Sequence, residues 1–292
     1  MKSQDIHVLP SGRVTSQSLR DRPLTRVETK KSLIKLTRLL IEYYNFFHCR
    51  GRMYEERAYR NLVKADDLIN FEVIVQETDL FVRAERNLSK EARESILKYR
   101  HQLETYIAMH PEFVKSLVPL GEDPYAPDIV KEMIRSSTLA HVGPMAAVAG
   151  AMAEFVSKDL LQFSEQVIVE NGGDTYLATT RKRKIGVFAG KSPLSLKLGI
   201  SISPEDSPVG VCTSSGTVGP SLSFGKADAV CILSKSAVLA DAAATAVGNL
   251  VCEKKDIERG LERGKEIEGV LGTLIIVDDR MGAWGDIRLI QL

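Results

Sequence analysis

Asp241 and Thr245, two polar residues of an alanine-rich segment, have side chains that could bind a hard cation together. The segment, VLADAAATAVGN at residues 238–249, has the composition of a closely packed helix. Residues four apart lie on the same face of a helix, so the carboxylate and the hydroxyl would offer two oxygen ligands to one point, as Mg²⁺ prefers. In the structural alternative, Asp241 interacts with the helix dipole and Thr245 hydrogen-bonds back to the carbonyl of Asp241. The spacing alone leaves both interpretations open.

A second candidate is the glycine pair in VENGGDTYL, residues 169–177. Gly172 and Gly173, which follow Asn171, could bring the backbone close to a ligand and form an anion-binding nest, with Asp174 orienting a hydroxyl or a cation. Asn followed by Gly after an apolar run is also the strongest short signal for a β-hairpin turn. The sequence therefore predicts a turn here, with or without a ligand.

A third candidate is CTSSGTVGPSLSFGKAD, residues 212–228, which is rich in hydroxyls and glycines. Loops of this length are usually functional or disordered, so a binding loop and a solvated loop both fit. The familiar phosphate motifs are excluded. The spacing before Lys226 is one residue too long for a P-loop, and Ala227 replaces the Ser or Thr that would bind magnesium. No G-x-G-x-x-G follows a predicted strand, and no G-x-S-x-G elbow is present.

The elements that must position these residues fall into two groups along the chain. A hairpin or two short strands are predicted at residues 71–85, and apolar periodicity predicts helices at 28–47, 89–109, 128–140, 145–156, 237–249 and 253–266. Short β-rich runs separated by Gly, Ser and Pro follow from residue 166, and two strands are predicted at the C-terminal end. Because helices gather and strands cluster instead of alternating, the pattern favours an α+β fold over a doubly wound sheet.

The charge of the chain is unevenly distributed. The 292 residues carry a net charge of +1, but residues 1–64 hold 14 Lys and Arg against six Asp and Glu. We predict that residues 1–56 form a basic, partly helical extension and that residues 57–292 form the body. The extension is compatible with an arm that binds a protein partner, a patch that binds nucleic acid, docking on a second subunit, or packing on the acidic body. The near-neutral charge of the whole chain disfavours a nucleic-acid partner.

Cysteine usage and hydropathy indicate a cellular compartment. Cys49, Cys212, Cys231 and Cys252 have no CxxC spacing, so neither a zinc site nor a redox pair is predicted. The first residues lack the apolar region of a secretory signal, and we find no apolar stretch long enough to span a bilayer. We therefore predict a cytoplasmic protein that does not enter a membrane.

Four phrases occur in an order that resembles a known superfamily. GPMAAVAGAMAE, ENGGD, SSG and ADAAATA, in this order, resemble motifs of the ApbE-like flavin transferases (FAD:protein FMN transferases). More closely, the chain resembles an uncharacterised family allied to that superfamily. The resemblance covers residues 57–292. It implies an ApbE-like, T-fold-related α+β domain with mixed helices and antiparallel sheet.

The resemblance also implies roles for particular residues. In the flavin transferases, an Asp and a Thr of the alanine-rich helix bind magnesium together with a backbone carbonyl near the earlier helix. The matching residues are Asp241, Thr245 and Ala146. The GGD turn and the T-S-G segment line the dinucleotide site, which implies that the following residues bind the cofactor: Asn171, Gly172, Gly173, Asp174, Ser214, Ser215 and Gly216. Mg²⁺ and FAD or a related nucleotide are the implied ligands.

Two departures from the superfamily pattern leave the reaction open. Ala147 or Val148 stands where the superfamily has lysine, and PSLSFGKAD contains no counterpart of the H-x-x-D-P-x-T-G segment. Lys226 and His141 are candidates to supply charge or acid–base chemistry instead. We expect a Mg²⁺-assisted flavin- or nucleotide-binding protein, with transfer or hydrolysis at an FAD-type pyrophosphate. The alternative is an inactive or differently specialised module that binds another phosphate-containing ligand or a protein partner.

Overall fold

The structure, a computed structural model, describes residue 60, residues 65–218 and residues 223–292. The predicted basic extension at residues 1–56, including its helix at 28–47, lies outside the described residues. The division between extension and body therefore remains a prediction, and the description below concerns the body.

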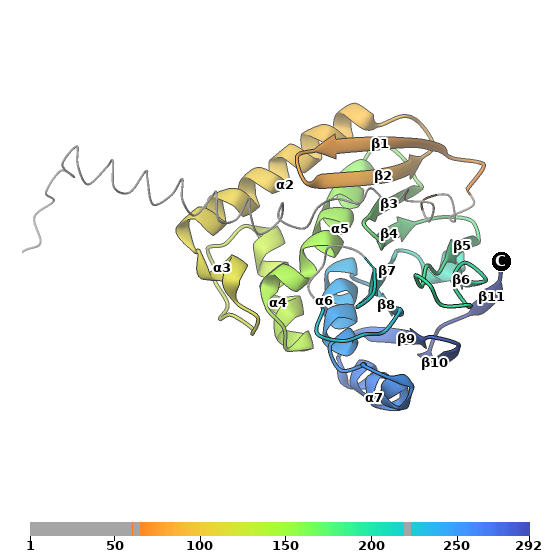
Figure 1. Cartoon of the computed structure of the whole chain (residues 1–292). Helices are drawn as coiled ribbons and strands as arrows, with labels where there is room; N and C mark the ends of the chain where they lie inside the picture. Colours follow the sequence, from red (N-terminus) through yellow and green to blue (C-terminus); the bar gives the residue numbers. More distant parts are fainter. Residues whose placement is uncertain (1–59, 61–64, 219–222) are drawn as a thin grey trace, which may run out of the picture. The chain divides into compact units, whose positions relative to one another are not determined.

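An eight-stranded antiparallel sheet forms the centre of the body (Figure 1). Its spatial order is β1-β2-β3-β4-β7-β8-β9-β10. The strands are β1 Ile69–Val75, β2 Thr78–Ala84, β3 Val167–Asn171, β4 Asp174–Ala178, β7 Val209–Ser214, β8 Ala229–Ser234, β9 Val270–Val277 and β10 Arg280–Gly285. Each strand pairs with its neighbour in the antiparallel sense. Short turns join β1 to β2, β3 to β4 and β9 to β10.

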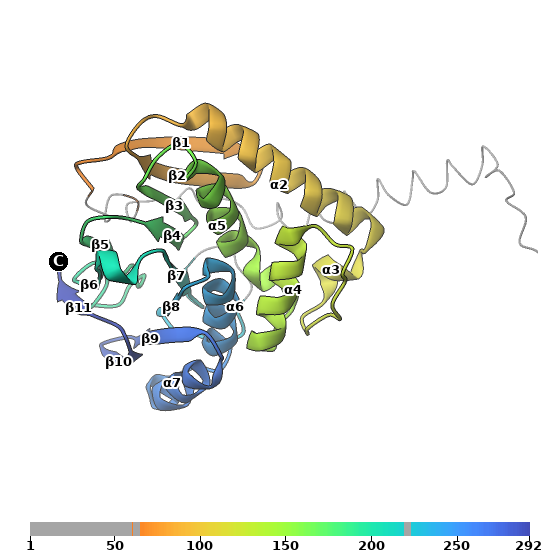
Figure 2. The same ribbon diagram turned by 180° about the vertical axis from the view of Figure 1, so that it is seen from behind.

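The helices cover one face of this sheet, as Figures 1 and 2 show from opposite sides. The α-helices are α2 Ser89–Met109, α3 Glu112–Lys115, α4 Asp128–Ala140, α5 Val148–Leu160, α6 Ala237–Gly248 and α7 Ile257–Glu266. Three 3₁₀ turns accompany them: η2 Pro144–Ala147, η3 Pro204–Asp206 and η4 Lys254–Asp256. The larger hydrophobic core lies between these helices and the sheet.

A second, smaller sheet covers the other face of the central sheet. It has the order β11-β6-β5, with β5 Arg183–Gly186, β6 Leu198–Ile202 and β11 Leu289–Gln291. Successive side chains of a central strand point to opposite faces of the sheet and so contribute to two different cores. Val167 and Val169 of β3 belong to the core on the helix side, and Ile168 between them belongs to the core under the small sheet. Burial on both faces explains why the central strands are almost continuously apolar.

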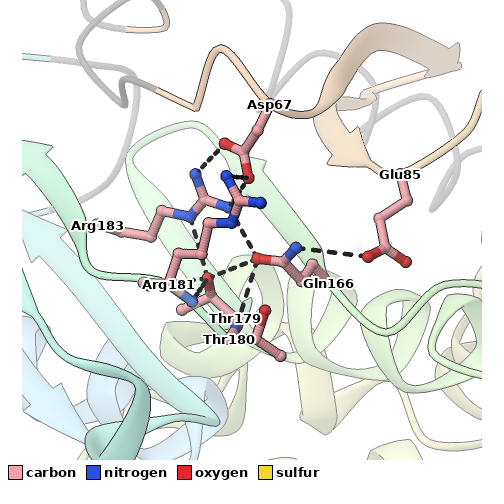
Figure 3. A network of polar contacts seen from close by, with 7 residues as sticks. All are labelled: Asp67, Glu85, Gln166, Thr179, Thr180, Arg181 and Arg183. Atoms are coloured by element: carbon pink, nitrogen blue, oxygen red, sulfur yellow. Dashed lines mark hydrogen bonds and ion pairs between the residues drawn. The ribbon is translucent and has the colours of Figure 1, made fainter.

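A buried polar network ties the small sheet to the central one (Figure 3). Arg183 of β5 forms an ion pair with Asp67, donating to Asp67 Oδ2 at 2.8 Å. The same nitrogen, Nη2, also donates to Gln166 Oε1 at 2.8 Å, and Nε donates to Thr179 Oγ1 at 3.0 Å. Thr179 follows β4 and Gln166 precedes β3, so one guanidinium joins the two ends of the β3–β4 hairpin to Asp67, which is 116 residues from Arg183 in the sequence.

The expected α+β class is confirmed, and most predicted elements are present. The hairpin at 71–85 is β1 and β2, and the helix at 128–140 is α4. The prediction of two C-terminal strands is wrong, because three are formed: β9, β10 and β11. In the part of the chain that the structure describes, no single helix is long and apolar enough to cross a membrane. One pair, Asp128–Ala140 with Pro144–Leu160, passes that test jointly but is bent by 104°.

Candidate functional site

Helices α5 and α6 approach each other closely because their facing residues are small. A Cβ atom added to Gly150 would lie 2.2 Å from the carbonyl oxygen of Ala237 and 2.8 Å from Cβ of Asp241. Glycine is therefore required at position 150 for this packing. The alanines of α6 are almost all buried, so the close contact accounts for the alanine-rich composition.

Asp241 places its carboxylate at the N-terminal end of α5. Its Oδ2 accepts a hydrogen bond from the backbone N–H of Gly150 at 2.8 Å. The first N–H groups of a helix have no partner within the helix, and no residue of α5 caps them with its own side chain. Asp241 thus supplies from α6 the acceptor that α5 lacks. Asp241 itself lies in the second turn of α6, not in the first turn, where the N-terminal end of the α6 dipole would act on it.

Glu154 of α5 does the same for α6. Its Oε2 accepts hydrogen bonds from the N–H groups of Ala237 at 2.7 Å and Val238 at 3.3 Å, and from Ser236 Oγ at 2.9 Å. Lys158 pairs with the other oxygen at 2.6 Å. We call the Asp241–Gly150 and Glu154–Ala237 contacts the reciprocal caps, because each helix receives a carboxylate from the other at its positive end.

The β3–β4 turn brings a second carboxylate to this point. Gly172 and Gly173 adopt φ values of 67° and 109°, which confirms the hairpin turn. Asn171 donates from Nδ2 to the carbonyl of Ala149 at 3.1 Å, which fastens the turn to the start of α5. Asp174 is buried, and its Oδ1 accepts from the N–H of Thr213 at 3.2 Å.

The two carboxylates influence each other. Burial raises the pKa of Asp174 to about 7, and the charge of Glu170 adds to this effect. Burial likewise raises the pKa of Asp241, and the negative charge of Asp174 raises it further. Two acids from separate elements therefore share one weakly solvated place. In such a place a proton or a cation stabilises the pair.

Cys212 of β7 completes the buried surroundings. Its Sγ donates to the carbonyl of Ala237 at 3.3 Å. Burial, together with the charges of Asp174 and Asp241, raises the pKa of this thiol well above its usual range. A thiol held in the protonated form is a poor nucleophile, so Cys212 acts here as a small packing residue and weak donor.

Thr245 lies one turn beyond Asp241 and is partly buried. Its hydroxyl makes no hydrogen bond to another of the described residues, so the back-bond to the carbonyl of Asp241 is not formed. Ala146, the expected carbonyl ligand, lies in η2, immediately before α5. Two of the predicted oxygen donors thus lie on α6, and the third lies in the 3₁₀ turn that leads into α5.

The predicted loop residues differ in how they are used. Ser214 ends β7, and its Oγ would be 3.4 Å from a Cβ added to Gly248, in the last turn of α6. Ser215 Oγ instead accepts from the N–H groups of Thr217 at 3.1 Å and Val218 at 3.0 Å. A Cβ on Gly216 would lie 2.2 Å from the carbonyl oxygen of Gly225. Ser215 and Gly216 therefore shape the loop, and Ser214 is the hydroxyl near α6.

His141 and Lys226 are both exposed. His141 is the residue that ends α4, with a left-handed backbone (φ 59°) and its N–H directed to the carbonyl of Thr138 at 3.2 Å. Lys226 donates its backbone N–H to Val251 at 2.8 Å. Neither side chain forms a hydrogen bond or ion pair with a described residue, so any role for them stays a prediction.

Sequence reasoning missed Glu154 and Cys212. Glu154 is a single acid in an otherwise apolar stretch, which was a usable signal for a buried acceptor. Cys212 carried no local signal, because its neighbours Asp174 and Ala237 are distant in the sequence. The structure fastens Asn171 to the start of α5 and brings Asp174 close enough to Asp241 for their charges to interact. Thr245 lies one turn further along α6, and Ser214 lies near the last turn of that helix.

This architecture is an ApbE-like fold. The crystal structure of the apo form of the flavinyl transferase ApbE from Pseudomonas stutzeri is similar, with a TM-score of 0.50 and 14% identity over 75% of this chain and 94% of that one. The flavin transferase ApbE from Vibrio cholerae gives a TM-score of 0.51 and 14% identity, covering 75% and 96%. At this identity the likeness shows the fold.

The family follows from the sequence comparisons. A family model described as "AbpE bacteria" matches residues 60–283, and the chain belongs to this family. A UPF0280 protein of Methanococcus aeolicus is 38% identical over 226 residues, 75% of this chain and 91% of the relative. A UPF0280 protein of Methanocaldococcus jannaschii is 41% identical over 221 residues, 74% and 90% of the two chains.

Proposed function

We propose that this chain binds a flavin or a related nucleotide through its phosphates, with a Mg²⁺ ion held by Asp241, Thr245 and the carbonyl of Ala146. The observation that carries the proposal is the meeting of Asp174 and Asp241. One carboxylate comes from a hairpin turn and the other from a helix. They lie together although burial and the nearby negative charge disfavour their ionised forms. Such an arrangement is typical of a functional site.

The residues present fit a hard cation. The donors are carboxylate, hydroxyl and carbonyl oxygens, the set that Mg²⁺ prefers. Thr245 has no hydrogen-bond partner among the described residues, and Asp241 is oriented by the N–H of Gly150. Asp174 would add negative charge beside the ion without being displaced, because the N–H of Thr213 holds it.

The residues present fit a nucleotide less completely than they fit a hard cation. Ser214 at the end of β7 would donate to a phosphate near α6, and the glycines of the turn would let the ligand approach the backbone. The N–H of Gly173 is already used by Glu170 Oε1 at 2.7 Å, so it would not join an anion nest. No lysine stands at Ala147 or Val148, and we propose that exposed Lys226 supplies the positive charge instead.

In this proposal the chain's own residues bind and orient the ligand. When bound, the cation would polarise the pyrophosphate and neutralise charge on the leaving phosphate, for transfer or for hydrolysis. The reciprocal caps would hold the oxygen donors of α5 and α6 in place, and the buried surroundings would limit access of water. The flavin transferases named above supply the substrate class by analogy of fold.

A second function is favoured by the reciprocal caps. The cap that Asp241 provides to α5 gives this residue a role in packing that needs no metal. The chain would then be a binding module for another phosphate-containing ligand or for a protein partner. The two functions differ in whether Asp241 must be charged.

Thermal unfolding of the full chain with FAD, FMN, ATP or NAD, each with and without Mg²⁺, tests the proposal. We expect FAD or a related nucleotide to stabilise the protein only when Mg²⁺ is present, by about 2.7 kcal/mol at 100 times its Kd. Asp241→Asn keeps an acceptor for the N–H of Gly150 but removes the charge, so it should fold and lose this response.

Glu154→Gln is the matched control, because it alters the other reciprocal cap and leaves the cation donors unchanged. It should lower the melting temperature yet keep the Mg²⁺-dependent response. An equal response in wild type and Asp241→Asn would contradict the cation site. The absence of any response to all four nucleotides would favour the second function.

A further inference from the structure

Glu170 connects the glycine turn to a buried arginine. This residue of β3 is only 5% exposed. Its Oε1 accepts from the N–H of Gly173 at 2.7 Å, and its Oε2 accepts from Nε of Arg60 at 3.0 Å. One carboxylate thus spans the distance between the turn and a residue that precedes β1.

Arg60 is fixed at its other end by the β1–β2 hairpin. Its Nη2 donates to the side chain of Asp79 at 2.9 Å and to the carbonyl of Asp79 at 3.0 Å. Its Nη1 pairs with Glu72, and its guanidinium lies 5.7 Å from the centre of the Phe81 ring. Arg60 is also the first residue that the family model matches. The guanidinium is therefore a fixed point and not a mobile surface charge.

The turn needs such a fixed point. Two consecutive glycines can adopt many backbone conformations, and Gly173 has a φ of 109° that side-chain-bearing residues rarely adopt. Glu170 removes this freedom by holding the N–H of Gly173. The next residue is Asp174, and Asn171 on the other side is bound to Ala149 of α5. A change in the turn would therefore move the Asp174 carboxylate relative to Asp241.

We infer that Arg60 and Glu170 are positioning residues of the cation and nucleotide site, acting through the turn at Asn171–Asp174. The inference rests on the proposed function for the identity of the ligand, but the fixing of the turn can be measured without it. Neither residue would touch the ligand. Supporting residues of this kind change metal affinity by about 10- to 100-fold when they are altered.

The variants separate positioning from general stability. Glu170→Gln keeps the size of the side chain and can still accept from Gly173, but its amide would meet the guanidinium as a second donor, which breaks the link to Arg60. Arg60→Met removes the link from the other end, and Arg60→Lys keeps the charge. Asp67→Asn is the matched control, since it breaks another arginine–carboxylate pair, that with Arg183 (Figure 3), whose network includes Gln166 at the opposite end of β3 from the turn.

The first measurement is the affinity of the full chain for Mn²⁺, followed by the paramagnetic resonance signal of the free ion well below the melting temperature. We expect Glu170→Gln and Arg60→Met to bind Mn²⁺ about 10-fold more weakly than wild type, and Arg60→Lys to recover part of the loss. Asp67→Asn should lower the melting temperature with Mn²⁺ affinity unchanged. Unchanged affinity in Glu170→Gln and Arg60→Met would overturn the inference.

The second measurement is hydrogen exchange across the β3–β4 turn in the protein without ligand. The N–H of Gly173 should be protected in wild type and in Asp67→Asn, and exposed in Arg60→Met. Protection that survives in Arg60→Met would overturn the inference even if Mn²⁺ binding changed. If wild type binds neither Mn²⁺ nor nucleotide while the turn still loosens, the proposed function fails and the fixing of the turn by Arg60 and Glu170 is supported.

Discussion

Asp174 is a residue whose charge the folded protein accommodates at a cost. Burial raises its pKa to about 7, and its hydrogen bond from Thr213 only partly offsets the loss of water. Side chains that serve a ligand often destabilise the protein when the ligand is absent. The same carboxylate that would strengthen cation binding should therefore weaken the ligand-free fold.

The variant Asp174→Asn tests whether this carboxylate favours cation binding while it lowers the stability of the ligand-free protein. The neutral side chain can still accept from Thr213, and it no longer carries a buried negative charge beside Asp241. We expect the ligand-free variant to be more stable than wild type at pH 8, on the order of 1–2 kcal/mol. Its Mn²⁺ affinity should fall in the same samples. Urea unfolding of both proteins measures the first effect, and a variant less stable than wild type would contradict it.

At the scale of elements, the contact between α5 and α6 depends on a glycine. Gly150→Ala would increase the intrinsic helix propensity of α5, but its Cβ would lie 2.2 Å from the carbonyl oxygen of Ala237. Because that oxygen belongs to the backbone, the helices must separate. We expect a net loss of about 1–3 kcal/mol in the free energy of unfolding.

Urea unfolding of Gly150→Ala against Gly121→Ala checks this expectation. A Cβ at Gly121 would meet nothing within 4 Å, so that variant controls for the loss of a glycine alone. Equal stability of the two variants would show that α5 and α6 can move apart freely. Because the N–H of Gly150 orients the Asp241 carboxylate, the separation of the helices in Gly150→Ala should also reduce the Mg²⁺-dependent response to nucleotide.

The elements themselves were largely predictable, because their signals are local. Apolar periodicity located α4, and the i, i+4 spacing placed Asp241 and Thr245 on one turn of α6. The C-terminal strands were miscounted because β10, RMGAWG, is mostly exposed and glycine-rich. The cap from Glu154 to Ala237, 83 residues away, depends on how the helices pack, and no single-sequence pattern encodes it.

At the scale of the whole body, the two sheets are joined by the network around Arg183 (Figure 3). The hydrogen bond from Arg183 is the main reason that the pKa of Asp67 is lowered to about 2, and burial acts against it. Arg183 is only 3% exposed, so it depends on this partner. The contact therefore stabilises the packing of the small sheet on the central one.

The pH dependence of this contact can be predicted. A carboxylate with a lowered pKa in the folded state stabilises the protein above its ordinary pKa of 3.8, and this contribution is lost as the pH falls through about 2. Wild type should exceed Asp67→Asn by on the order of 1–2 kcal/mol from pH 7 to about pH 5. Chemical unfolding at several pH values should show the difference shrinking below pH 4, whereas a constant difference would contradict the ion pair.

The reciprocal caps also have a consequence for how the body opens. If α6 unravels from its N-terminal end as far as Asp241, Glu154 loses the N–H groups of Ala237 and Val238, and the N–H of Gly150 in α5 loses the Asp241 carboxylate. The opening of α5 has the mirror effect on α6. Fraying of either helix would therefore remove a cap from the other, so we expect the two helix ends to open together as one cooperative unit.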